Sequence, residues 1–175
     1  MKKIILTVFA ASSLLLYSTP SFAISLSVGV PIGASIKGDD GSEVADGASG
    51  YFLGVQLPFG LGLGMDSHKT KFKDDSTLKV ATSMYNLYYQ LPVPVVSLIL
   101  GLGTGNSNFD CPGCAEVFDK GAATQWYTSI GFPIIPLFDI HLSYRSITSK
   151  NIKDPDGDKY DVSGTITGIG LAFNF

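Results

Sequence analysis

The chain has 175 residues, of which 45% are hydrophobic, and its 12 Lys and Arg residues are outnumbered by 15 Asp and Glu residues. This acidic balance argues against a nucleic-acid partner, because binding to a phosphate backbone requires clustered basic side chains. The sequence contains no basic patch with interleaved aromatic residues.

The first 23 residues have the composition of a secretory signal peptide. Lys2 and Lys3 precede an apolar stretch over residues 4–17, and the segment ends in Ser-Phe-Ala at Ala23. We expect cleavage after Ala23, because the apolar run is short for a membrane helix and no stop-transfer pattern follows it. The remaining residues 24–175 are expected to form one domain, with 10 basic and 15 acidic residues and a net charge of -5.

Residues 24–175 alternate between apolar and small or polar residues in eight segments, and no segment has helical spacing. Alternation of this kind predicts β-strands. The eight predicted strands cover residues 24–35, 49–58, 60–71, 78–91, 95–105, 122–132, 137–148 and 161–175. Each is long enough to cross a bilayer at a tilt, which takes roughly 9–11 residues.

The predicted connections alternate between two kinds. The short and nearly uncharged ones are residues 58–60, 92–94 and 133–136. The long polar ones are residues 36–48, 72–77, 106–121 and 149–159. Short turns on one rim and long loops on the other are typical of outer-membrane barrels. We therefore expect the short turns and both termini on the periplasmic side, with the long loops extracellular.

The chain closes on a strand that ends in the exposed aromatic residue Phe175. Its larger residues Ile169, Leu171 and Phe173 share one face with Phe175, while the other face carries mainly glycine. This pattern resembles the closing strand of a bacterial outer-membrane barrel. The resemblance implies that the barrel-assembly machinery recognises this strand.

The charge distribution separates a membrane barrel from a soluble one. A soluble barrel presents one face to water, and that face usually carries charged residues. Here the face opposite the large apolar residues is mostly Gly, Ser, Ala, Gln and Asn, and nearly all charges lie in the long loops. The few exceptions within strands are Asp66, His68, Asp139, His141 and Arg145. Lipid outside and a compact lumen inside satisfy this pattern, and closure removes the unpaired edges that hydrocarbon does not tolerate.

Aromatic residues are predicted to form two belts at the membrane interfaces. The belt at the short-turn rim comprises Phe59, Tyr89, Phe132, Phe138, Phe173 and Phe175. The belt at the long-loop rim comprises Tyr51, Trp126 and Tyr144.

Together, the leader, strand number, loop asymmetry and Phe175 resemble the small eight-stranded outer-membrane barrels, a group that includes the OmpX/Ail proteins, the OmpA transmembrane domain and OmpW. The resemblance covers the whole of residues 24–175 and singles out no member. It implies an all-β fold, a closed eight-stranded antiparallel up-and-down transmembrane barrel. It also implies outer-membrane lipid and lipopolysaccharide as the surroundings, and no cofactor.

Two loop motifs have alternative interpretations. Cys111 and Cys114 flank a Pro-Gly pair in the third long loop, and in an oxidising compartment they are expected to form a disulfide that closes a turn. Asp154, Asp156 and Asp158 lie at alternate positions in the fourth loop, where they are either Ca²⁺ ligands or a solvated acidic loop. The glycine position does not match an EF-hand, which favours the solvated loop.

Within the strands, His141 and Ser143 resemble the histidine and serine of the outer-membrane lipid A deacylases. The alternation places both in the lumen and separates them by about 6–7 Å, which disfavours catalysis. Arg145 in the lumen requires a partner, and Asp139 lies about 20 Å away along the same strand. We expect a polar network of Arg145, His141 and Asp66, with Asp161 as the alternative partner, and with Asp139 among the polar residues of the lumen.

The lumen also carries many glycines, which either let the sheet curve or leave a cavity.

Three functions remain open at this point. The first is a non-enzymatic outer-membrane barrel whose extracellular loops serve surface interaction or envelope integrity. The second is a narrow OmpW-like channel or binding cavity for small apolar solutes. The third is a lipid A-modifying hydrolase that uses His141 and Ser143.

Overall fold

The computed structural model describes residues 24–37, 45–73, 77–93, 95–112, 114, 118–135, 137–153 and 156–175. The predicted leader over residues 1–23 lies outside the described residues, as does Asp154 of the fourth loop. Within the part of the chain that is described, no helix is both long enough and apolar enough to cross a membrane.

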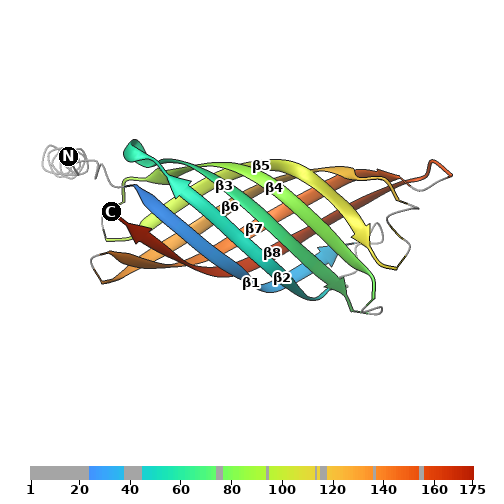
Figure 1. The fold of residues 1–175 in the computed structure, drawn as a ribbon, viewed down its shortest axis with the longest axis horizontal. Coiled ribbons are helices and arrows are strands. Elements are labelled where there is room, and N and C mark those ends of the chain that lie inside the picture. Colours follow the sequence, from blue (N-terminus) through green and yellow to red (C-terminus); the bar gives the residue numbers. More distant parts are fainter. Residues whose placement is uncertain are drawn as a thin grey trace, which may run out of the picture.

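Eight antiparallel strands follow one another around a closed barrel in the order of the sequence (Figure 1). The strands are β1 (Ser25–Lys37), β2 (Ala45–Gln56), β3 (Leu61–Phe72), β4 (Lys79–Leu91), β5 (Ser97–Asp110), β6 (Gly121–Ile135), β7 (Phe138–Lys153) and β8 (Lys159–Asn174), with a 3-10 turn η1 (Pro58–Gly60) between β2 and β3. The predicted fold and the eight predicted strands are confirmed.

The strand boundaries differ from the prediction mainly at the long-loop end. β5 continues to Asp110 and β7 to Lys153, so the third and fourth loops are shorter than expected. Most of the added residues are polar, with Phe109 and Ile152 as exceptions, and they still pair with their neighbours, as Asp110 does with Lys79. Ladder hydrogen bonds satisfy the backbone in water as well as in lipid, so the strands continue beyond the apolar part of the wall.

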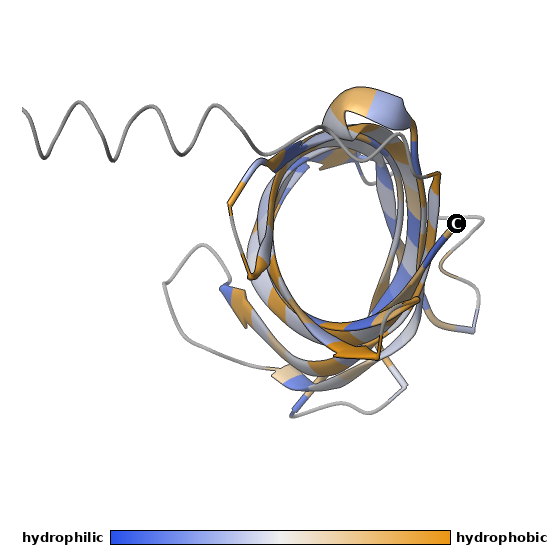
Figure 2. Ribbon diagram, turned by 90° about the vertical axis from the view of Figure 1, so that its left-hand side faces the viewer, coloured by the Kyte–Doolittle hydropathy of each residue, from blue (hydrophilic) through white to orange (hydrophobic). Residues whose placement is uncertain are grey.

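The alternation along each strand separates two faces of the wall, seen as alternating colours when the barrel is viewed along its axis (Figure 2). Large apolar residues face outward and are exposed, including Leu63 at 58%, Leu87 at 53% and Leu102 at 69%. Inward-facing residues such as Met84 and Asp66 are almost completely buried. The apolar surface of this protein therefore lies on the outside of the barrel.

The β1–β2 pair is the irregular part of the wall. Its register runs only from Ser25 opposite Gln56 to Gly29 opposite Phe52. Beyond that point β1 pairs with β8 as far as Lys37, and β2 pairs with β3. Pro31 lacks a backbone N–H, and β1 has a register shift directly after it. Among the described residues, the outer parts of β1 and β2 therefore form a seam without ladder pairs.

Candidate functional site in the barrel lumen

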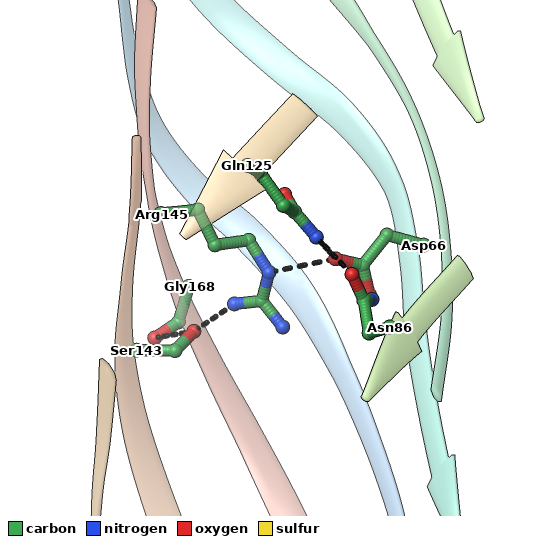
Figure 3. A network of polar contacts seen from close by, with 6 residues as sticks. All are labelled: Asp66, Asn86, Gln125, Ser143, Arg145 and Gly168. Carbon is green, nitrogen blue, oxygen red and sulfur yellow. Dashed lines mark hydrogen bonds and ion pairs between the residues drawn. The ribbon is translucent and has the colours of Figure 1, made fainter. Parts of the chain in front are cut away.

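A buried ion pair lies at the centre of the lumen. Arg145 of β7 donates from Nε to Asp66 Oδ2 of β3 over 3.0 Å, and both side chains are at least nine-tenths buried. Gln125 of β6 donates to the same Asp66 oxygen over 2.7 Å, and it also donates to Asn86 of β4. These strands come from different sides of the barrel, so the contacts span the lumen (Figure 3).

Ser143 completes this group, which we call the plug cluster: Arg145, Asp66, Gln125, Asn86 and Ser143. The Ser143 hydroxyl accepts a hydrogen bond from Arg145 Nη1 and donates to the Gly168 carbonyl over 3.4 Å (Figure 3). A charge in a low-dielectric interior is costly unless it is paired and hydrogen-bonded, and the plug cluster meets both conditions.

Two aromatic rings hold the Arg145 guanidinium from the sides. Its central carbon lies 3.6 Å from the centroid of Phe52 and 4.9 Å from that of Tyr127. Such cation–π contacts are worth more when desolvated, about 2 kcal/mol or more. The guanidinium is thus fixed by an ion pair, a serine and two rings at once.

A second polar group, the mouth cluster, lies nearer the short turns and comprises His141, Asp139, Ser129, Ser97 and Gln90. Ser129 Oγ lies 3.3 Å from His141 Nδ1, and Ser97 donates to Asp139 over 3.2 Å. The Nε2 atom of His141 is 4.0 Å from Asp139 Oδ2, which is too long for a hydrogen bond.

The expected single network is therefore divided. The structure brings Arg145 and Asp66 together, but it places His141 with Asp139 in the mouth cluster rather than with Arg145. The alternative partner, Asp161, instead accepts a hydrogen bond from the backbone N–H of Asn151 over 3.0 Å. Asn86, Gln125 and Ser129 were not singled out by the sequence, although each falls on the inward face by alternation.

The contacts do not favour the hydrolase hypothesis. Ser143 hydrogen-bonds to Arg145 and Gly168 rather than to His141. His141 contacts Ser129 instead, but the Ser129 hydroxyl also lies 3.1 Å from the Leu142 carbonyl, to which it donates. A nucleophilic serine donates its proton to the base, so neither serine is in an activated arrangement.

Aromatic side chains fill the space that the lumen glycines leave open. A Cβ atom added at Gly62 would overlap the ring of Tyr88, and one added at Gly101 would overlap the ring of Tyr127. Each glycine lies directly opposite its tyrosine on the neighbouring strand. At these two positions the packing supplies a reason for glycine that was not among the two explanations considered from the sequence, curvature or an empty cavity.

Two small cavities lie on either side of the plug cluster among the described residues. One of about 60 Å³ lies towards the mouth cluster and is lined by Tyr88, His141 and Arg145, among others. A second, of about 30 Å³, lies towards the long loops and is lined by Ile36, Ile147 and Ile166 together with hydroxyl side chains. Each has room for a few water molecules.

The other predicted features occupy the surface. Cys111 and Cys114 lie next to each other with their Cα atoms 5.1 Å apart, and the disulfide itself stays a prediction. Among the described residues no group of three His, Cys, Asp or Glu side chains is placed to hold a metal. Since Asp154 lies outside those residues, the Ca²⁺ interpretation of Asp154, Asp156 and Asp158 also stays a prediction.

The residues of the predicted aromatic belts face outward. Trp126 and Tyr144 are adjacent at the long-loop side, with ring centroids 5.8 Å apart. At the opposite rim, Phe173 packs against Phe138 at 4.8 Å and Phe175 at 4.5 Å. The remaining belt residues, all exposed, are Tyr51, Phe59, Tyr89 and Phe132.

Comparison with solved structures places the fold among small outer-membrane barrels. Neisserial surface protein A has a TM-score of 0.65 at 13% identity, with 87% of this chain and 96% of that chain covered. The outer-membrane protein AlkL has a TM-score of 0.55 at 10% identity, with coverages of 90% and 92%. Outer-membrane protein W of E. coli has a TM-score of 0.53 at 10% identity, with coverages of 89% and 100%.

No protein-family model and no curated protein matches the sequence. The likeness predicted from the sequence is thus confirmed for the fold, a closed eight-stranded outer-membrane barrel, and no specific family is identified.

Proposed function

We propose that this chain is an integral, non-conducting and non-enzymatic barrel of the bacterial outer membrane, whose extracellular loops serve surface interaction or envelope integrity. The outward apolar wall supports the location. Transfer of apolar surface from water to an apolar medium is worth about 25 cal/mol per Å², and the wall exposes Leu63, Leu87 and Leu102 by more than half. Lipid is the medium that stabilises such a surface.

The arrangement of the ends supports the orientation. The start of β1 and the end of β8 lie at the same end of the barrel as the turn η1 (Figure 1). Barrels of this kind have short periplasmic turns and longer extracellular loops. We therefore place both termini in the periplasm, where the closing strand with Phe175 is available to the assembly machinery.

The plug cluster is the observation that carries the non-conducting function. Eight strands enclose a lumen just wide enough for side chains to fill, and here the Arg145–Asp66 pair crosses it between two aromatic rings. The cavities on either side, of about 60 and 30 Å³, have room for a few water molecules each.

Single-channel recording tests this proposal. The refolded wild-type protein is expected to produce no current steps in planar bilayers. The variant Arg145→Ala/Asp66→Ala removes both charges together, so that no lone buried charge remains, and it is expected to produce steps. Reproducible steps from the wild-type protein would reject the non-conducting function.

A second candidate, a binding cavity for small apolar solutes, is favoured by the seam between β1 and β2. Behind the seam lies an apolar group of Phe52, Ile147, Ile166 and Ala34. The 30 Å³ cavity is partly lined by the same residues. Since no ladder pairs tie the two strands together there, a solute could enter from the membrane side by separating them.

Binding of the fluorescent apolar probe N-phenyl-1-naphthylamine tests this second candidate. Ile166→Trp places a large ring in the 30 Å³ cavity. Ile169→Trp on the same strand adds an equal volume to the lipid face. If the cavity binds apolar solutes, Ile166→Trp lowers saturable probe binding about tenfold, and Ile169→Trp leaves it within about twofold. The tenfold loss corresponds to roughly the free energy of burying one aliphatic side chain. Equal binding by the two variants would reject the candidate.

A further inference from the structure

Three lysines gather on the outward face of β3 and β4 at the long-loop end. Lys69 and Lys71 follow Met65 and Ser67 along the outer face of β3, and Lys79 begins β4. Lys71 and Lys79 lie directly opposite each other in the ladder. We call Lys69, Lys71 and Lys79 the lysine patch.

The patch carries excess positive charge even though the chain as a whole is acidic. The Nζ atom of Lys69 lies 2.6 Å from Asp110 Oδ2 at the end of β5. Their hydrogen bond lowers the pKa of Asp110, so this carboxylate stays ionised and offsets one lysine. Asp74 and Asp75 are close in the sequence and lie outside the described residues. Asp110 is also the ladder partner of Lys79, so this one carboxylate lies beside two of the three lysines. Like charges directly opposite each other in a ladder are destabilising, so Lys71 and Lys79 favour a further anion between them.

The height of the patch matches the head-group layer of a membrane. Met65 and Tyr85, paired in the ladder, are the last large apolar residues on the outer face of these two strands. Lys69 and Lys71 lie four and six residues further on, which corresponds to roughly 10–15 Å along the barrel axis at the usual strand tilt. A lysine side chain extends its ammonium group along such a surface to reach a polar layer.

The lysines are confined to one end of the barrel. Every lysine among the described residues lies at the long-loop end, and the described part of the short-turn rim has none. Lys37 of β1 stands apart from the others on its strand. A second group comprises Lys150 and Lys153 of β7 with Lys159 of β8, which is directly opposite Lys153 in the ladder. The outer leaflet facing β3 and β4 therefore meets one of two concentrations of lysine on the wall.

We propose that the lysine patch binds the phosphate groups of a lipid head group in the outer leaflet. Ammonium groups are common phosphate ligands that act as point charges, and basic residues close to an anionic lipid surface add attraction one by one. The proposal rests on membrane insertion with the long loops outside, as set out above, and it adds a recognition site on the outer face of the wall.

Binding of bisphosphorylated lipid A by the detergent-folded protein, followed by native mass spectrometry, tests the proposal. The variant Lys69→Gln/Lys71→Gln/Lys79→Gln is compared with Lys37→Gln/Lys150→Gln/Lys159→Gln, which removes one lysine each from β1, β7 and β8 at the same rim. The patch variant is expected to bind on the order of tenfold more weakly than the wild type, and the control variant to stay within about twofold. Lipid A without phosphates is expected to bind all three proteins equally weakly.

Three outcomes would overturn the proposal: an equal loss in both variants, undiminished binding of dephosphorylated lipid A, or displacement of lipid A by an equal concentration of inorganic phosphate. Far-UV circular dichroism and heat-modifiable gel mobility establish that each variant is folded. A protein that folds as a monomer without detergent contradicts the membrane function itself, whereas a detergent-folded protein indifferent to lipid A phosphates contradicts only the lysine patch.

Discussion

Arg145→Met is expected to lower the free energy of unfolding by about 3–5 kcal/mol, the cost of removing one partner from a buried ion pair. Asp66 is only 1% exposed, so its carboxylate would be left charged in the lumen with Gln125 as its remaining donor. The rings of Phe52 and Tyr127 would lose the guanidinium between them. Equilibrium urea unfolding in lipid vesicles measures the change.

Two further variants separate the ion pair from general packing. Adding Asp66→Asn to Arg145→Met removes the uncompensated charge, so the double variant is expected to be more stable than Arg145→Met alone. Lys150→Met changes an exposed residue of the same strand and is expected to shift stability by no more than about 0.5 kcal/mol. A loss for Arg145→Met as small as that for Lys150→Met would show that the pair does not stabilise the lumen.

Leu87→Arg on the outer wall is expected to destabilise the barrel by about 2–4 kcal/mol, the cost of a basic residue near the bilayer midplane. Leu87 faces outward between Leu63 and Leu102 in register, so its ladder neighbours on both sides are apolar. Ser83→Arg, four residues away on the same outward face, lies beside Ser67 and Asn106 and is expected to cost about 0–1 kcal/mol.

The same vesicle unfolding assay compares the two arginine variants. A difference between them reports the depth of each residue in lipid, because both substitutions add the same side chain to the same strand. If both variants matched the wild type, water rather than hydrocarbon would surround the wall, and the membrane function would fail with it.

Alternation was sufficient to predict the strand number and the inward placement of Arg145 and Asp66, whereas the closed barrel was predicted from the loop asymmetry, the charge distribution and the resemblance to known barrels as well. It could not decide between Asp66 and Asp161 as the partner of Arg145, because that choice depends on the stagger of strands that are far apart in the sequence. The same stagger brings Gln125 and Asn86 to the level of Asp66. Sequence spacing gives distances along a strand, whereas the plug cluster is built across the barrel.

Two further features depended on contacts between neighbouring strands. The tyrosines that fill the hollows at Gly62 and Gly101 belong to the adjacent strand, so the composition of one strand does not reveal them. The early end of the β1–β2 ladder follows Gly29, and Pro31 is its only visible sign in the sequence. The polar extensions of β5 and β7 were assigned to loops because a membrane pattern predicts strands only where the wall is apolar.

The pairing of tyrosine with glycine makes the interior unusually open to engineering. Tyr88 covers Gly62 and Tyr127 covers Gly101 on the neighbouring strand, so truncating a single ring uncovers the lumen face of two adjacent strands. The hydrogen-bonded backbone does not fill the lumen, so the circumference of the barrel would stay the same after truncation. Successive truncations at these two tyrosines and at Arg145 would thus convert the filled barrel into a series of pores of increasing diameter, suited to use as sensors.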